Sequence, residues 1–296
     1  MSICFDHITE EDVFAAPAGT GSIATFLEER LERVQALLGE RSILEATLAT
    51  MEGLTPDPVN GPALLNFLRE GIVADDGRTE IRSTLRALAR ALQPRTYLEI
   101  GTRRGWSLAQ VAAECRHVRA WAVDMWIPAY GAVSNPGPGF VHEELERVAP
   151  GFEGRCHYID GNSHDVLPLF LGDLGAWPRT PEELAVMRQS ESRPRCFDLV
   201  TVDGDHTAVG AWWDLCDVMP HVALGGAVVF DDLLDISDER MGDEARCARP
   251  GREAPPSDLK PSLLDVWRKV QQRFPNFLYL ERLDARPPLG IAVRMG

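Results

Sequence analysis

The segment "RTYLEIGTRRGWSLAQVAAEC", residues 95–115, decides the class of fold. It begins with a short apolar run, turns through Gly101 and Gly105, and continues with apolar residues at helical spacing. Glycines at such points let the chain turn tightly and let backbone N–H groups approach a ligand. A second apolar run, "RAWAVD", follows and ends in Asp124. This order of strand, glycine turn, helix and acid-terminated strand is typical of parallel sheets that bind nucleotides.

The same alternation continues along the chain. Apolar strand-like segments occupy residues 156–160, 197–203 and 226–232, and helix-like segments occupy residues 163–170 and 207–219 between them. Strands that alternate with helices require right-handed crossovers and predict a parallel sheet covered on both faces. Strands that are apolar throughout fit such a sheet, because both of their faces are buried.

The C-terminal end follows a different pattern. After a helix-like segment at 262–274, "NFLYLERL" and "GIAVRM" lie close enough in the sequence to pair as an antiparallel hairpin. Three long segments, 127–140, 176–195 and 240–261, are rich in Pro, Gly and charged residues and are predicted to be loops.

Residues 1–92 contain helical periodicity but no chemical motif. Apolar residues recur at helical spacing over 22–39 and again over 81–92. Ser42 followed by Glu45 predicts a capping box at the start of a further helix. We interpret residues 1–92 as a helical cap or an oligomerisation region, through which the protein could form a homo-oligomer.

Composition excludes several classes of partner. The hydrophobic fraction of 45% and the charged fraction of 25% are ordinary for a globular protein. A net charge of -15 argues against nucleic acid, because nothing would neutralise the phosphates. No apolar run reaches the roughly 18 residues of a membrane span, and "MSICFDHITEEDVF" lacks the pattern of a signal peptide. The six cysteines form no C-x-x-C pair, so we expect reduced thiols and a cytoplasmic location rather than a disulfide or zinc framework.

Acidic side chains follow two of the predicted strands. Asp203 ends "FDLVTVD", and Asp231 and Asp232 end "GAVVFDD". Ligands bind outside the carboxyl ends of the strands in such sheets. Neighbouring carboxylates there would repel and raise one another's pKa, which a divalent cation would relieve. Oxygen ligands favour Mg²⁺ over Ca²⁺ or Mn²⁺; the alternative is that these acids only bind backbone amides or cap loops.

His206 is the leading candidate for a general base, because imidazole titrates near neutrality and lies three residues after Asp203. Asp205 is the second candidate. The alternative for His206 is a structural role as the cap of the helix that begins near Thr207. Trp212 and Trp213 on that helix are expected in the core or at an interface.

The motifs "EIGTRRGWS", "AVDMW", "DGNS", "VDGDH" and "GGAVVFDD" together resemble those of class I S-adenosylmethionine-dependent methyltransferases. The most similar group is the bacterial one with cephalosporin-biosynthesis methyltransferases and Mg-dependent macrolide-sugar O-methyltransferases. The resemblance covers residues 95–233. It implies a Rossmann-like, seven-stranded, mostly parallel α/β sheet with a C-terminal antiparallel hairpin, preceded by the N-terminal helical region. Residues 93–296 would be the methyltransferase domain.

The resemblance also implies residue roles. The methionine part of the cofactor would lie on the glycine turn, its ribose at Asp124, and its adenine beside Asn162 and Ser163. The complete set of cofactor contacts implied is Glu99, Gly101, Thr102, Gly105, Ser107, Asp124, Met125, Asn162, Ser163 and Asp203. Asp203, Asp231 and Asp232 match the acids with which the related antibiotic-sugar enzymes bind Mg²⁺. We expect Arg103 and Arg104 to be solvated, with the alternative that one of them pairs with the cofactor carboxylate. Trp126 could line the cofactor pocket.

These observations predict an S-adenosylmethionine-dependent, Mg-dependent O-methyltransferase that acts on a small specialised metabolite, a sugar or a phenol, in antibiotic biosynthesis. A metal-independent N-methyltransferase is an alternative and would not need Asp231 and Asp232 together. An NAD-dependent oxidoreductase is disfavoured because G-x-G-x-x-G is missing. A non-catalytic scaffold is disfavoured because the acid and histidine set is intact. The sequence does not identify the methyl acceptor.

Overall fold

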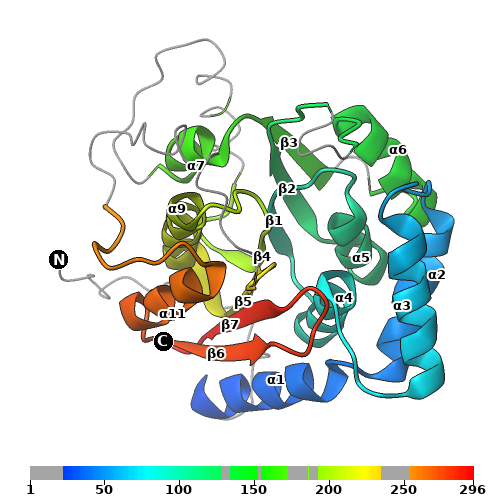
Figure 1. The fold of residues 1–296 in the computed structure, drawn as a ribbon, viewed down its shortest axis with the longest axis horizontal. Helices are drawn as coiled ribbons and strands as arrows, with labels where there is room; N and C mark the ends of the chain where they lie inside the picture. The colour runs from blue at the N-terminus through cyan, green and yellow to red at the C-terminus, as the bar shows by residue number, and fades with distance from the viewer. Residues whose placement is uncertain (1–22, 129–133, 153–154, 173–185, 187–192, 235–253) are drawn as a thin grey trace.

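The computed structural model describes residues 23–128, 134–152, 155–172, 186, 193–234 and 254–296 (Figure 1). Within these ranges the chain forms a central sheet covered by helices on both faces. None of the described helices has the length and apolar character that crossing a membrane requires. The calls for loops at 176–195 and 240–261 fall largely outside the described residues.

The sheet has seven strands in the order β3-β2-β1-β4-β5-β7-β6. The first five are parallel, β7 runs antiparallel to β5, and β6 runs antiparallel to β7, so the predicted fold class is confirmed. The strands are β1 (Thr96–Ile100), β2 (Arg119–Asp124), β3 (Cys156–Asp160), β4 (Phe197–Val202), β5 (Val222–Phe230), β6 (Phe277–Arg282) and β7 (Leu289–Arg294).

The register of the parallel strands places their carboxyl ends level with one another. Ile100 aligns with both Val123 and Val202, and Val202 aligns with Phe230. The residues that directly follow are Gly101, Asp124, Asp203 and Asp231. The register therefore brings the glycine turn and the predicted strand-end acids to one edge of the sheet.

Two buried apolar clusters fill the spaces on either side of the sheet. One contains side chains of the helices α1 (Ile23–Leu37), α2 (Arg41–Gly53), α3 (Gly61–Ala74), α4 (Ile81–Leu92), α5 (Trp106–Glu114) and α6 (Pro138–Val148). The other contains side chains of α7 (Ser163–Leu171), α9 (Ala208–Val218), η3 (Met219–His221) and α11 (Leu263–Arg273). Figure 1 shows α2, α3, α4 and α5 on one side of the strands and α7, α9 and α11 on the other. The domain boundary at residue 92 stays a prediction.

Helix α6 was not predicted from the sequence. The segment 127–140 was assigned to a loop, but α6 begins at Pro138 within it, with Gly137 as its N-cap residue. A proline is tolerated in the first turn of a helix because its missing N–H has no partner there in any case. The Pro and Gly content that suggested a loop therefore marks the start of a helix at this point.

The capping box predicted at Ser42 and Glu45 is wrong. Helix α2 begins two residues earlier than a cap at Ser42 implies, at Arg41, and its N-cap residue is Glu40. Glu45 accepts a hydrogen bond from Nε of Arg41 at 2.8 Å instead. Glu45 therefore takes part in an i,i+4 ion pair with Arg41, which forms because both residues lie inside the helix.

Candidate active site

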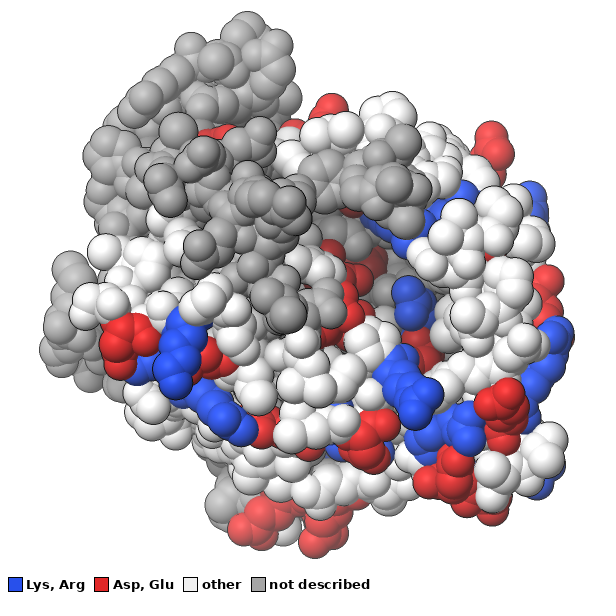
Figure 2. Space-filling model, in the orientation of Figure 1, with Lys and Arg blue, Asp and Glu red and all other residues white. Residues whose placement is uncertain are grey.

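A cavity of about 750 Å³ lies at the carboxyl ends of β1, β2, β4 and β5. Figure 2 shows this face hollowed, with acidic and basic side chains next to the hollow. The predicted site residues that line the cavity are Gly101, Thr102, Ser107, Asp124, Met125, Asn162, Ser163, Asp203, Asp205, His206, Asp231 and Asp232. Glu99 and Gly105 do not line it. The structure thus brings almost the whole predicted set around one space.

The glycine turn depends on both of its glycines. Gly101 has a φ of +85°, and a Cβ there would lie 1.8 Å from the backbone oxygen of Asp203. Gly105 has a φ of +72°, and its Cβ would lie 2.6 Å from Cγ1 of Val141. Gly101 is therefore required for the close approach of the β1 and β4 ends, and Gly105 for the packing of α5 against α6.

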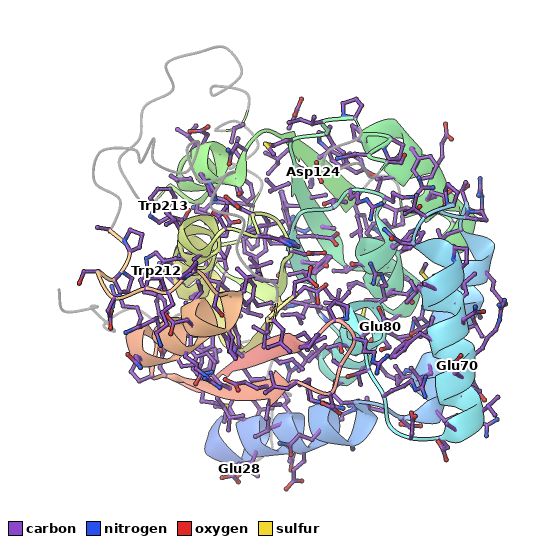
Figure 3. All side chains as sticks on the ribbon, viewed as in Figure 1. Glu28, Glu70, Glu80, Asp124, Trp212 and Trp213 are labelled. Atoms are coloured by element: carbon purple, nitrogen blue, oxygen red, sulfur yellow. The ribbon has the colours of Figure 1, made fainter. Side chains whose placement is uncertain are left out.

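Asp124, at the end of β2 (Figure 3), is held by three donors from the protein. Its Oδ2 accepts a hydrogen bond from the backbone N–H of Arg103 at 2.7 Å. Its Oδ1 accepts from the backbone N–H of Trp126 at 2.7 Å and from Nδ2 of Asn135 at 2.9 Å. Each carboxylate oxygen has two lone pairs, so Oδ2 retains an acceptor position for a ligand hydroxyl.

The residues predicted to lie beside the adenine start helix α7. Oδ1 of Asn162 accepts a hydrogen bond from the backbone N–H of His164 at 3.0 Å, so Asn162 caps the helix. Its amide group keeps donors that can serve a ligand, since an Asn side chain carries both an acceptor and two donors. Ser163 is the first residue of the helix and lines the cavity.

Glu99 is the second-last residue of β1 and does not line the cavity. Its side chain is buried, and Oε2 has no hydrogen-bond partner among the described residues. Burial raises the pKa of Glu99 well above its ordinary value, and the charges of Asp203 and Asp124 raise it further. A buried carboxyl without a full set of partners fits a site for a cationic ligand, because such a ligand supplies the missing positive charge.

The acids at the ends of β4 and β5 converge as the sequence indicated. Asp231 is 5% exposed, and Oδ1 of its side chain has no hydrogen-bond partner among the described residues. Burial raises the pKa of Asp231 well above its ordinary value, with additional contributions from Asp203 and Asp232. This mutual repulsion is the condition under which a divalent cation stabilises a group of carboxylates.

His206 lies between two of these acids. Its Nε2 is 3.4 Å from Oδ1 of Asp203, and its Nδ1 is 3.5 Å from Oδ2 of Asp232. Ligand atoms of Asp203, His206 and Asp232 all lie within 4.8 Å of one another, which fits a divalent ion. The structure therefore groups His206 with two of the predicted metal ligands, while the carboxyl of Asp231 lies outside this group.

The cap of helix α9 is Thr207 and not His206. Oγ1 of Thr207 accepts a hydrogen bond from the backbone N–H of Gly210 at 3.0 Å. Asp205 also faces this helix, because its Oδ1 accepts from the backbone N–H of Thr207 at 2.7 Å. Its Oδ2 lies 3.5 Å from Nε2 of His164. The alternative in which His206 caps the helix is therefore wrong.

Sequence reasoning missed the contribution of Arg82, which lies in the first turn of α4 and lines the cavity. Its Nη1 is 3.1 Å from Oε2 of Glu80. Burial opposes the charge of Arg82, but the carboxylates of Glu80, Asp231 and Asp203 raise the pKa of its guanidinium. No local signal identifies this residue, because in the sequence it is one polar position of an amphipathic helix.

The structure corrects the expectations for Arg103, Arg104 and Trp126. Arg104 was expected to be solvated but is 7% exposed, and Arg103 pairs with Asp57. Trp126 does not line the cavity and packs against Tyr158, with ring centroids 6.1 Å apart. Trp212 and Trp213 are buried in the core between α9 and its neighbours, as expected (Figure 3).

Residues 98–233 match the model of a protein family described as a methyltransferase domain. The strand order, the glycine turn and the strand-end acids agree with this match, and together they support a class I S-adenosylmethionine-dependent methyltransferase. A comparison with curated protein sequences gives no significant match.

Solved structures similar to this chain include the O-methyltransferase TomG from Streptomyces achromogenes, which is involved in tomaymycin synthesis and was crystallised with S-adenosylmethionine. It shares 18% identity over 72% of this chain and 78% of its own, with a TM-score of 0.43. An O-methyltransferase from Bacillus cereus in complex with S-adenosylhomocysteine shares 15% identity over 92% and 100% of the two chains, with a TM-score of 0.44. The Podospora anserina methyltransferase PaMTH1 shares 15% identity over 93% and 99%, with a TM-score of 0.42.

Proposed function

We propose that this methyltransferase transfers a methyl group to a hydroxyl oxygen of a small specialised metabolite, a sugar or a phenol, with the help of a divalent metal ion, Mg²⁺. The observation that carries the proposal is that Asp203, His206 and Asp232 face the same cavity as the glycine turn. A base and an acid cluster next to the cofactor site are the groups that methylation of a weakly acidic hydroxyl requires.

The cofactor would extend along the carboxyl ends of β1, β2 and β3. S-adenosylmethionine supplies a methyl group on a sulfonium, which is already a good leaving group. Asp124 would accept hydrogen bonds from the ribose, Asn162 and Ser163 would contact the adenine, and Ser107 would bind the carboxylate. The contribution of these residues is to hold the methyl group in line with the acceptor oxygen.

The acceptor hydroxyl would lie beside His206. The side chain of His206 is 41% exposed, so its imidazole is accessible from the cavity. Asp203 and Asp232 flank the ring and would stabilise the imidazolium that forms when the base takes the proton. A divalent cation held by Asp203 and Asp232 would polarise the acceptor hydroxyl and lower its pKa.

Two further assignments belong to the proposal. Residues 1–92 would serve as a helical cap or an oligomerisation region of the methyltransferase domain at 93–296. The protein would act in the cytoplasm, as part of antibiotic biosynthesis, without binding nucleic acid.

Methyl transfer from labelled S-adenosylmethionine to a panel of sugars and phenols tests the proposal. We expect EDTA to abolish turnover and Mg²⁺ to restore it. Asp232→Asn should lose turnover while it still binds S-adenosylhomocysteine. Asp160→Asn is the matched control, since Asp160 also lies at the carboxyl end of a parallel strand, β3, but does not line the cavity. Full turnover after chelation, with no metal found by elemental analysis, would contradict the proposed role of Mg²⁺. It would support the alternative, a metal-independent N-methyltransferase.

A further inference from the structure

The segment that joins α2 to α3 reaches the glycine turn from the N-terminal helical region. Oδ2 of Asp57 lies 2.9 Å from Nη2 of Arg103. Nη2 of Arg104 donates to the backbone oxygens of Thr55 and Pro56 at 3.3 and 3.4 Å. Both arginines belong to the turn between Gly101 and Gly105, so residues 55–57 contact the cofactor side of the sheet directly.

Asp57 is itself fixed in position. It is 1% exposed, and its Oδ1 accepts hydrogen bonds from the backbone N–H groups of Val59 and Asn60 at 2.9 and 3.4 Å. Oδ2, the oxygen that remains, is the one that pairs with Arg103. The side chain therefore uses one oxygen to shape the start of α3 and the other to hold the glycine turn.

Helix α6 also contacts the segment formed by residues 55–57. The backbone N–H and Oγ1 of Thr55 donate to the two carboxylate oxygens of Glu144 at 2.5 and 2.7 Å. Glu144 is 1% exposed and pairs with Arg147 at 2.9 Å. Residues 55–57 are thus held between α6 and the glycine turn, and movement of either would break these contacts.

Arg103 connects Asp57 to Asp124, the residue predicted to bind the ribose. Its φ is +49°, a left-handed conformation that a residue with a Cβ adopts at a cost in backbone strain. In this conformation its backbone N–H donates to Oδ2 of Asp124 at 2.7 Å, and its Nε donates to the backbone oxygen of Ser134 at 3.2 Å. Burial lowers the pKa of the Arg103 guanidinium, and the charge of Asp57 opposes that shift. The ion pair therefore also stabilises the charged form of Arg103.

We propose that Asp57 and Arg103 are positioning residues for the cofactor. Their ion pair holds Arg103 in its left-handed conformation, and the backbone N–H of Arg103 then holds the carboxylate of Asp124 in the orientation that receives the ribose hydroxyls. The N-terminal helical region thereby completes the cofactor site of its own chain. The inference rests on the proposed function in one respect, the assignment of the ribose to Asp124.

Calorimetric titration of the full chain with S-adenosylhomocysteine tests the inference. Asp57→Asn keeps an acceptor for Val59 and Asn60 and removes the charge, and Arg103→Ala removes the partner. We expect each variant to bind about tenfold more weakly, the scale of a lost charge-assisted hydrogen bond. The double variant should bind no more weakly than either single one, because both remove the same interaction. Arg103→Lys, which keeps a cation for Asp57, should recover part of the affinity.

Glu114→Gln is the matched control. Glu114 pairs with Arg90 at 2.8 Å and also joins the N-terminal helical region to α5, but it does not line the cavity. This variant should lower the melting temperature and leave the affinity unchanged. In turnover, Asp57→Asn should raise the KM for S-adenosylmethionine and leave kcat at saturating cofactor near the wild-type value.

The outcomes separate the two assignments. Wild-type affinity in both Asp57→Asn and Arg103→Ala, with only a lower melting temperature, would overturn the positioning role and leave the proposed function intact. Failure of the wild-type protein to bind S-adenosylhomocysteine would overturn the cofactor site and the positioning role together.

Discussion

At the scale of single residues, His206 is the side chain that could serve either of the two proposed roles, general base or metal ligand. Its ring lies 3.4 Å from Asp203 and 3.5 Å from Asp232, so it can act either as a base that these acids stabilise or as a metal ligand beside them. Asp205, two residues after Asp203, faces the backbone of Thr207 instead. The structure thus favours His206 over Asp205 as the group that meets the acceptor.

Replacing His206 with alanine should separate catalysis from cofactor binding. If the imidazole takes the acceptor proton, His206→Ala should lower kcat by about 10²–10⁴, the usual contribution of a general base. The affinity for S-adenosylhomocysteine should stay close to that of the wild type, because the ring faces the acceptor. Steady-state kinetics and calorimetry measure the two quantities.

Asp205→Asn serves as the control for this substitution. It should keep most of the activity, because an amide oxygen can still accept from the backbone of Thr207. If Asp205→Asn abolishes turnover while His206→Ala keeps most of it, the base is Asp205. If neither substitution matters, deprotonation falls to the metal or to water. A loss of metal content in His206→Ala would make the histidine a ligand.

At the scale of elements, the parallel strands gather carboxylates that the local sequence keeps far apart. Glu99 is the second-last residue of β1, and Asp203 and Asp231 directly follow β4 and β5. Because the strand ends are level, burial and mutual repulsion raise the pKa of Glu99 and of Asp231. A sheet edge of this kind is stabilised by cationic ligands and loses stability without them as the acids ionise.

Glu99→Gln should reduce the pH dependence of stability in the absence of cofactor. The folded protein keeps a proton on Glu99 at pH values where the unfolded chain, with an ordinary value of 4.5, has lost it. The folded state is therefore favoured at low pH, and this contribution is lost as the pH rises from that ordinary value through the raised one. Glutamine carries no such proton, so the melting temperature of the variant should fall less between about pH 5 and pH 8. Equal slopes in the two proteins would contradict the raised pKa. Glu45→Gln, an exposed position, should keep the wild-type slope.

At the scale of the whole molecule, the N-terminal helices and the sheet share one buried cluster. Leu85, Leu88 and Leu92 of α4 pack in the same core as Tyr97 of β1 and Leu108 of α5. A region that supplies part of the core of its neighbour does not fold apart from it. We therefore expect the described part of the chain to unfold as one cooperative unit.

Leu88→Ala tests this coupling. Leu88 is fully buried, so the substitution should lower the free energy of unfolding by about 2–5 kcal/mol, the range for a buried leucine. Chemical denaturation should still show one transition, and hydrogen exchange in β1 should accelerate together with exchange in α4. Val73→Ala is the control, because Val73 is 86% exposed and its loss should change little. A separate early transition confined to residues 23–92 would show that the two regions are independent.

The sequence by itself determined the sheet, the glycine turn and the acids at the ends of the strands. Apolar runs that alternate with amphipathic segments indicate a parallel α/β sheet, because each strand must bury both faces. Ligands of such a sheet bind at the carboxyl ends of the strands, so Asp124, Asp203 and Asp231 could be named before any coordinates. Local periodicity and a general rule of the fold were sufficient for these acids, whereas Thr102, Met125, Asn162 and Ser163 were named from the resemblance to a methyltransferase family.

Only the tertiary structure decided which side chains complete the site. Arg82 and Asp57 come from the N-terminal helical region and meet the glycine turn and the acid cluster through space. The orientation of Asp205 toward α9 and of His206 toward the acids also depends on packing between elements. Contacts between residues far apart in the chain leave no pattern in either local sequence, because each residue is locally an ordinary polar position. Their placement follows from how the helices pack against the sheet, which the periodicity of one segment does not specify.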